Sequence, residues 1–182
     1  MFTLTKEEKK YLLASARERI ASELEKRPPE YREPTENLKN RYGAFVTLHT
    51  KGALRGCIGQ MTGTLPLYEL IRDMAVSSAF SDPRFPPLSK KEFANTDIEI
   101  SVLSPMEEIS DPESVEVGVH GIYMQRGPYS GVLLPQVPVE QGWNRETFLT
   151  HTCYKAGLGG NCWREGDTRI LVFTAEVFGE KE

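Results

Sequence analysis

The segment from Leu54 to Gln60 brings together residue types that can carry chemistry. Side chains alternate along a β-strand, so Arg55 and Cys57 are expected on one face. A guanidinium beside a thiol favours the thiolate, which is the nucleophilic form of cysteine. Gly56 and Gly59 are typical of a bulge or of a close approach by a ligand or another backbone. We therefore predict Cys57 as a nucleophile or redox thiol and Arg55 as an anion-binding group; the alternative is a buried inert cysteine beside an ion-paired arginine.

The strand that precedes this segment sets which side chains lie beside Cys57. Residues 42–49 alternate in polarity, and Lys51-Gly52 marks a turn. A loop of odd length aligns His49 with the Arg55 face, whereas an even loop aligns Leu48 with it. Because a one-residue slip exchanges the two faces of a strand, we predict the odd register, with His49 nearer to Arg55 than Leu48 is.

A second group of candidates closes the strongest predicted helix, which covers residues 64–81. Ser78 lies on its apolar stripe, and Asp82 and Arg84 follow its end. A carboxylate here can hold Arg84 or Arg55 by charge-assisted hydrogen bonds. The alternative interpretation is a helix stop with a surface ion pair, which stabilises a protein little.

Four further residues are predicted to contact a ligand, with Gln60 ending the Cys57 strand and His120, Gln136 and Lys155 lying in the second half of the chain. His120 stands next to a glycine, where a histidine often only bonds the backbone. Gln136 follows Leu134-Pro135 at a predicted strand end, where its side chain either faces a ligand or is merely exposed. Lys155 shares a helix face with His151, which lies four positions before it.

The expected elements combine into an α+β fold with a mostly antiparallel or mixed sheet, flanking helices and two lobes. The pattern predicts helices over 5–26, 64–81 and 144–156, a short capped turn after Ser89, and strands over 42–49, 54–60, 97–103, 120–125, 131–134 and 168–178. A segment rich in proline and acidic residues, 104–114, is expected to cross from a larger to a smaller lobe of one domain spanning 1–182.

Composition excludes several classes of function. The chain of 182 residues has a formal net charge of −4, which argues against a nucleic-acid-binding regulator. It contains no apolar run long enough for a membrane span, and its charged start is unlike a signal peptide. No phosphate-binding loop or dinucleotide-binding glycine pattern is present, so we expect no nucleotide cofactor.

The cysteines point to a reducing compartment. Cys57, Cys153 and Cys162 are an odd number without a secretory signal, so we expect free thiols and a cytoplasmic location. No two of them have CxxC spacing and the three histidines are scattered, so neither a metal site nor a cofactor is predicted. Cys153 falls on the core side of its helix and is expected to be a packing residue.

Several motifs, in their order along the chain, resemble the AMMECR domain family, known in prokaryotes as AmmeMemoRadiSam system protein A. They are Leu54-Arg55-Gly56-Cys57-Ile58-Gly59, Asp82-Pro83-Arg84-Phe85-Pro86-Pro87, Ile100-Ser101-Val102-Leu103, Val117-Gly118-Val119-His120-Gly121-Ile122, Leu134-Pro135-Gln136-Val137, Trp143 and Lys155-Ala156-Gly157. The resemblance implies a two-lobed α+β fold with the Arg55–Cys57 strand near a groove. It also implies a Memo-like protein and a radical-SAM protein as partners, but it supplies no established reaction.

Three hypotheses about function follow. The leading one is a cytoplasmic enzyme or enzyme subunit that acts on a small anionic ligand or a partner protein around Arg55 and Cys57. The second is a non-catalytic binding or scaffold protein that uses the same groove with the Memo-like and radical-SAM partners. The third is a nucleic-acid-binding regulator, which the acidic charge disfavours. The sequence does not decide whether the chain is an enzyme.

Overall fold

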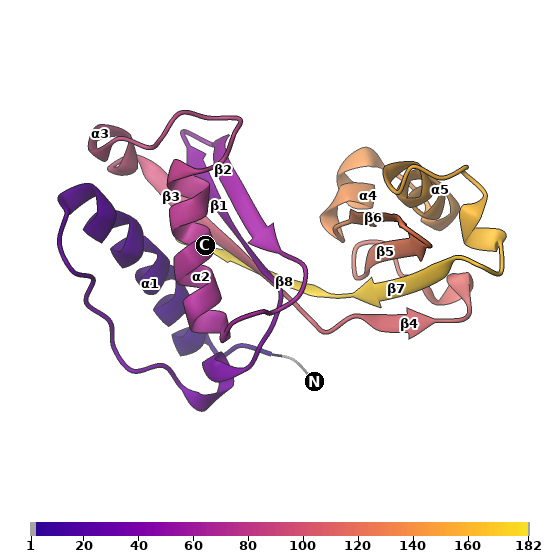
Figure 1. Cartoon of the computed structure of the whole chain (residues 1–182), viewed down its shortest axis with the longest axis horizontal. Helices are drawn as coiled ribbons and strands as arrows, with labels where there is room; N and C mark the ends of the chain where they lie inside the picture. The colour runs from indigo at the N-terminus through magenta and orange to yellow at the C-terminus, as the bar shows by residue number, and fades with distance from the viewer. Residues whose placement is uncertain (1–2, 182) are drawn as a thin grey trace. The chain divides into compact units, whose positions relative to one another are not determined.

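The computed structural model describes residues 3–181, which divide into two compact units (Figure 1). The first unit contains residues up to Leu103 and those from Glu176 onward, and the second contains Ser104–Ala175. The first holds α1 (Lys6–Glu25), η1 (Glu36–Lys39), β1 (Ala44–Thr50), β2 (Ala53–Gln60), α2 (Leu67–Phe80), α3 (Lys90–Phe93), β3 (Thr96–Leu103) and β8 (Ala175–Gly179). The second holds β4 (Glu107–Ile109), η2 (Pro112–Ser114), β5 (Gly121–Arg126), β6 (Tyr129–Leu133), α4 (Gln136–Gln141), α5 (Arg145–Lys155), η3 (Cys162–Arg164) and β7 (Arg169–Phe173).

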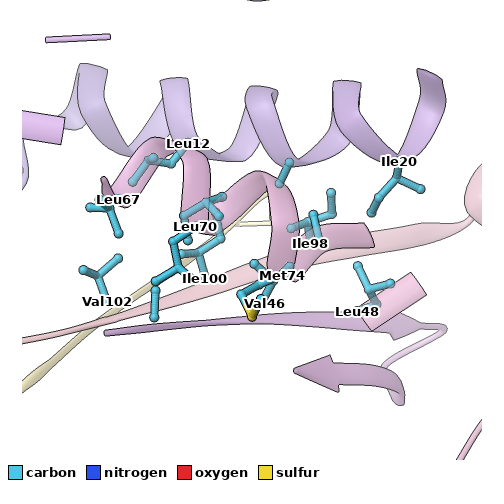
Figure 2. Close-up of a cluster of buried hydrophobic side chains, with 14 of the residues drawn as sticks. Leu12, Ile20, Val46, Leu48, Leu67, Leu70, Met74, Ile98, Ile100 and Val102 are labelled. Carbon is cyan, nitrogen blue, oxygen red and sulfur yellow. The ribbon is translucent and has the colours of Figure 1, made fainter. Parts of the chain in front are cut away.

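Each unit contains one antiparallel sheet of four strands, so the predicted α+β class is confirmed, with two sheets. In the first unit the strand order is β2-β1-β3-β8, and α1 and α2 pack against one face. Figure 2 shows how that core forms from one stripe of each helix and alternate residues of β1 and β3. The buried residues include Leu12 and Ile20 of α1, Leu67, Leu70 and Met74 of α2, Val46 and Leu48 of β1, and Ile98, Ile100 and Val102 of β3.

The first helix begins and ends where the sequence indicates. Thr5 and Glu8 form the predicted capping box, which satisfies backbone N–H groups that the first turn leaves free. The helix stops at Lys26, whose left-handed backbone turns the chain before Pro28-Pro29. Although α1 has 20 residues, neither it nor another helix among residues 3–181 is apolar enough to cross a membrane.

The β1–β2 hairpin has the predicted register at Cys57, but its loop differs in length from the predicted one. Thr50 pairs with Ala53, so Lys51-Gly52 forms an even loop of two residues rather than an odd one. The register then shifts because Arg55 is an extra residue on β2, between the pairs of His49 with Leu54 and Leu48 with Gly56. This one-residue bulge places Cys57 opposite Thr47, on the face that an odd loop would have given it.

The second unit builds its core between the sheet, in the order β4-β7-β5-β6, and α5. Asn144 caps α5 as predicted, accepting a hydrogen bond from the Thr147 N–H. Cys153 and Cys162 are fully buried in this core, but they are joined by a disulfide. The prediction of three free thiols is therefore wrong for these two, and the argument from cysteines to a reducing compartment no longer holds.

Other differences concern the elements of this unit. The single strand predicted over 168–178 is two strands, β7 and β8, which belong to different sheets and meet at Thr174. The short strand β4 lies inside the predicted crossing 104–114. Gln136 begins the short helix α4 and does not follow a strand directly. The β5–β6 hairpin, by contrast, forms as predicted.

Candidate functional site

Cys57 lies on β2, at the edge of the first sheet, on the face away from the helices. Its partner across the ladder is Thr47, whose neighbours Val46 and Leu48 point into the helix-covered core. The Thr47 hydroxyl donates a hydrogen bond of 3.3 Å to the Cys57 sulfur. Cys57 is half-buried and is the free cysteine of the chain. The sulfur thus has a hydrogen-bond partner, and Cys57 is not among the residues of either buried core.

At the open edge of β2, two side chains bond the backbone groups that a neighbouring strand would otherwise bond. Asp82 Oδ2 accepts a hydrogen bond of 2.9 Å from the Cys57 N–H, and Arg84 Nη2 donates one of 3.3 Å to the Cys57 carbonyl. The same guanidinium donates from Nε and Nη2 to both oxygens of Asp82, at 3.0 and 2.7 Å. An edge strand normally leaves such groups to solvent. Here a buried carboxylate and an arginine fix both backbone groups of one cysteine.

The pair also sets the charge next to the sulfur. The hydrogen bond from Arg84 holds the pKa of Asp82 well below its usual range, and the Cys57 N–H adds to this against the effect of burial. The pKa of Arg84 is raised, chiefly by Asp82 and to a smaller extent by the attraction of a Cys57 thiolate. The Arg84 side chain is 54% exposed, whereas that of Asp82 is 1% exposed. A ligand can therefore reach the cation but not its carboxylate partner.

Ser78 and Gly56 let α2 lie close enough to β2 for this arrangement. The Ser78 hydroxyl accepts a hydrogen bond of 2.9 Å from the Ile58 N–H and donates one of 2.7 Å to the Val46 carbonyl. A Cβ on Gly56 would come closer than 3.0 Å to the Ser78 carbonyl oxygen. Only glycine fits between strand and helix here, so both predicted residues serve to position Cys57.

Arg55 is buried, with 8% of its surface exposed, and it anchors the segment after α2. Its Nε donates to Glu92 at 3.1 Å and its Nη2 donates to the Pro86 carbonyl at 2.8 Å, while Nη1 is buried without a partner among residues 3–181. Hydrogen bonds from the Ser89 backbone and from Arg55 lower the pKa of Glu92 to about 2. Arg84, which lies outside the strand motif, is the arginine that contacts Cys57.

The remaining predicted residues of this unit have local roles. The Phe45 ring lies over Gly59, where a Cβ would collide with it. Gln60 accepts a hydrogen bond of 2.7 Å from the Thr64 hydroxyl in the loop after β2. His49 pairs with Leu54, one position before the bulge.

Three predicted residues belong to the second unit. The His120 Nδ1 accepts a hydrogen bond of 3.1 Å from the Glu116 N–H, which is the backbone role that the sequence left open. Gln136 and Lys155 are exposed, at the start of α4 and the end of α5. Next to Lys155, the Ala156 backbone lies against Gly131 of β6, so close that a Cβ on the glycine would clash.

Sequence reasoning did not identify two functional contacts. The Thr47 hydroxyl is one, although Thr47 lies two positions before His49 and so shares the strand face that the predicted register gives to His49. Glu92 as the partner of Arg55 is the other, and no local pattern joins residues 37 positions apart. Among the described residues, no group of three or more histidine, cysteine or acidic side chains is placed to hold a metal ion.

The fold and this site define a class of two-unit α+β proteins with an Arg-Gly-Cys edge strand. The AMMECR1 family model matches residues 13–178, and the chain belongs to that family. A crystal structure of the protein PH0010 from Pyrococcus horikoshii is similar over 99% of this chain and 95% of that one, with a TM-score of 0.85 and 41% identity. A protein of Methanopyrus kandleri, MK0488, is 44% identical over 98% of this chain and 91% of its own length. A protein of Nanoarchaeum equitans, NEQ441, is 43% identical over 80% of this chain and 84% of its own.

Proposed function

We propose that the chain is an enzyme, or an enzyme subunit, in which Cys57 acts as a nucleophile on a small anionic ligand or on a partner protein. The observation that carries the proposal is the contact of Asp82 and Arg84 with both backbone groups of Cys57. These bonds fix the backbone at residue 57, and the hydrogen bond from the Thr47 hydroxyl holds the sulfur that projects from it. Here Cys57 is half-buried, its sulfur accepts a hydrogen bond from Thr47, and its carbonyl accepts one from an accessible cation.

The chemistry that fits is attack by a thiolate on an electrophilic carbon. The thiol first loses its proton to solvent; the sulfur then forms a bond to carbon, and the leaving group departs with its electron pair. Arg84 would attract the anionic part of the ligand while keeping its bonds to Asp82, because a guanidinium has five N–H donors. Thr47 would orient the sulfur through the hydrogen bond that it already donates.

Alkylation with two reagents of equal shape and different charge tests this proposal. Iodoacetate is anionic and iodoacetamide is neutral, and Cys57 is the free thiol that both report when no reductant is added. We expect Arg84→Gln to lower the ratio of the iodoacetate rate to the iodoacetamide rate about fivefold, since unit charges 4 Å apart in water attract by about 1 kcal/mol.

Two further variants make the result specific. Arg84→Lys keeps the charge and should retain most of the ratio. Arg164→Gln removes an exposed arginine that pairs with Glu146 in the second unit, and should change nothing. An unchanged ratio in Arg84→Gln, or very slow labelling of Cys57 by both reagents in the wild-type protein, would refute a nucleophile served by Arg84.

The partner part of the proposal rests on the family resemblance. Co-purification of a Memo-like protein and a radical-SAM protein with the wild-type chain and with Cys57→Ser separates the two roles. Partners that remain bound to both chains, together with a negative alkylation result, favour the scaffold function over the enzyme.

A further inference from the structure

A second candidate site lies on the first unit, away from Cys57, in a cavity of about 640 Å³. This volume is within the range of small-molecule sites. The cavity lies between α1 and the extended segment 30–35, which runs antiparallel to the helix. Three contacts fix that segment: the Glu30 N–H donates to Glu18 at 2.8 Å, the Tyr11 hydroxyl donates to the Arg32 carbonyl at 2.8 Å, and the Thr35 hydroxyl donates to Glu8 at 2.7 Å.

Glu8 is a buried charge without a counter-charge. It lines the cavity and is 5% exposed, yet no lysine, arginine or histidine among residues 3–181 forms an ion pair with it. Burial alone would raise the pKa of Glu8, but hydrogen bonds from Thr35, the Thr5 backbone and Asn37 lower it below its usual range. Buried carboxylates are normally paired with a cation, because hydrogen bonds to neutral donors leave the charge uncompensated. The N-terminus of α1 offsets part of this charge.

One oxygen of Glu8 still has room for a donor. Oε2 accepts hydrogen bonds from the Thr5 N–H, the Thr5 hydroxyl and Asn37, whereas Oε1 accepts only from Thr35 among residues 3–181. A carboxylate oxygen accepts two bonds readily, so Oε1 can take one more. The neighbouring Glu7 also lines the cavity, and it too has no ion-pair partner within residues 3–181.

The middle of the cavity is aromatic. Tyr11, Ala14 and Tyr31 line it beyond Glu8. The Tyr31 ring lies 3.4 Å from the Arg72 guanidinium, and its buried hydroxyl has no hydrogen-bond partner among the described residues. Lys10 and Arg32 also line the cavity and are exposed. The walls thus offer an anionic end and a ring-lined body.

We propose that this cavity binds a primary organic amine, with its ammonium group on Glu8 Oε1 and an apolar or aromatic body against Tyr11 and Tyr31. The site is separate from the Cys57 site and does not depend on the proposed function. An acid of the same shape would place a second negative charge beside Glu8 and is rejected.

Phenethylamine and hydrocinnamate test the assignment, because they share a ring and a two-carbon spacer and differ in charge. Titration of the full chain, followed by NMR and by the thermal unfolding midpoint, should show saturable binding of phenethylamine. Hydrocinnamate should bind at least about tenfold more weakly, as expected from loss of a charged hydrogen bond. Equal binding of both compounds, or no binding of phenethylamine, overturns the proposal.

Glu8→Gln separates the charge from the fold. Glutamine is also a capping-box residue, so α1 keeps its N-terminal hydrogen bonds. We expect about a tenfold loss of phenethylamine affinity in this variant. Glu23→Gln, which removes a carboxylate from the same helix outside the cavity, should bind as the wild type does. Unchanged binding in a folded Glu8→Gln protein overturns the site.

Discussion

Both sheets end in a strand whose glycine lies against a helix backbone, but the two edges are completed differently. On β2, Gly56 meets Ser78 of α2; on β6, Gly131 meets Ala156 at the end of α5. The first edge continues with polar side chains that bond the backbone of Cys57 and Ile58. The second packs onto an apolar core that a disulfide crosses.

The two cysteine environments make the same contrast. Cys57 keeps a free sulfur that accepts a hydrogen bond from Thr47 at a half-buried position. Cys153 and Cys162 are fully buried, bonded to each other and in contact with the sulfur of Met124, at 3.5 and 3.7 Å. Polar support that fixes a free thiol is consistent with reactivity, whereas burial in a disulfide stabilises a fold. The comparison therefore contrasts a free thiol with polar neighbours on one edge with a buried disulfide in the core behind the other.

The largest expected loss of stability comes from removing the disulfide. The double variant Cys153→Ala and Cys162→Ala should lower the free energy of unfolding of the second unit by about 3 kcal/mol, the loop entropy expected for cysteines 9 positions apart. Chemical denaturation followed by hydrogen exchange on α5 measures this loss. Cys57→Ala is the matched control and should cost less, because that side chain is half-buried. Equal losses in both variants would remove the contrast between the two environments.

Alanine at the two glycines sharpens the comparison of the two edges. Gly56→Ala and Gly131→Ala should each lower the free energy of unfolding by about 1–3 kcal/mol, because the new Cβ collides with helix backbone that cannot simply rotate away. Gly166→Ala is the control, since a Cβ there meets nothing within 4 Å.

The readout that separates the two edges is thiol reactivity. Gly56→Ala should also change the rate at which iodoacetamide labels Cys57, because it displaces the strand that carries the sulfur. Gly131→Ala should leave that rate unchanged. A change of equal size in both variants would mean that reactivity follows general stability and not the local support of Cys57.

The parts of the fold that follow local periodicity could be predicted from the sequence. The apolar stripe of α2, from Leu67 to Ala79, is buried as its spacing indicates, and Ile98 and Ile100 alternate into the same core. The hydrogen bond between Asp82 and Arg84 was one of two predicted alternatives, since these residues are two positions apart. Short-range patterns carry such information because neighbours in sequence are neighbours in space.

The features that sequence reasoning missed depend on contacts between distant residues. The disulfide requires the end of α5 to meet η3, which no spacing rule specifies. Residues 168–178 contain no glycine or proline, so nothing in the sequence signals that the chain passes at Thr174 from one sheet to the other. A bulge was one of the two explanations predicted for Gly56 and Gly59, but its place at Arg55 appears only when β2 pairs with β1.

The smallest expected effect concerns the ion pair behind the Cys57 strand. The folded-state pKa of Glu92 is about 2, below the ordinary glutamate value of 4.5, so its contribution to stability is present above pH 4.5 and is lost as the pH falls through about 2. Glu92→Gln should therefore flatten the fall in thermal unfolding midpoint between these pH values. The change should be modest and salt-sensitive, because the Glu92 side chain is 42% exposed. Glu146→Gln breaks an exposed ion pair in the second unit and should leave the pH dependence of the unfolding midpoint unchanged. If Glu92→Gln also leaves it unchanged, the bond between Arg55 and Glu92 does not contribute to stability, and Arg55 is held by its bond to the Pro86 carbonyl.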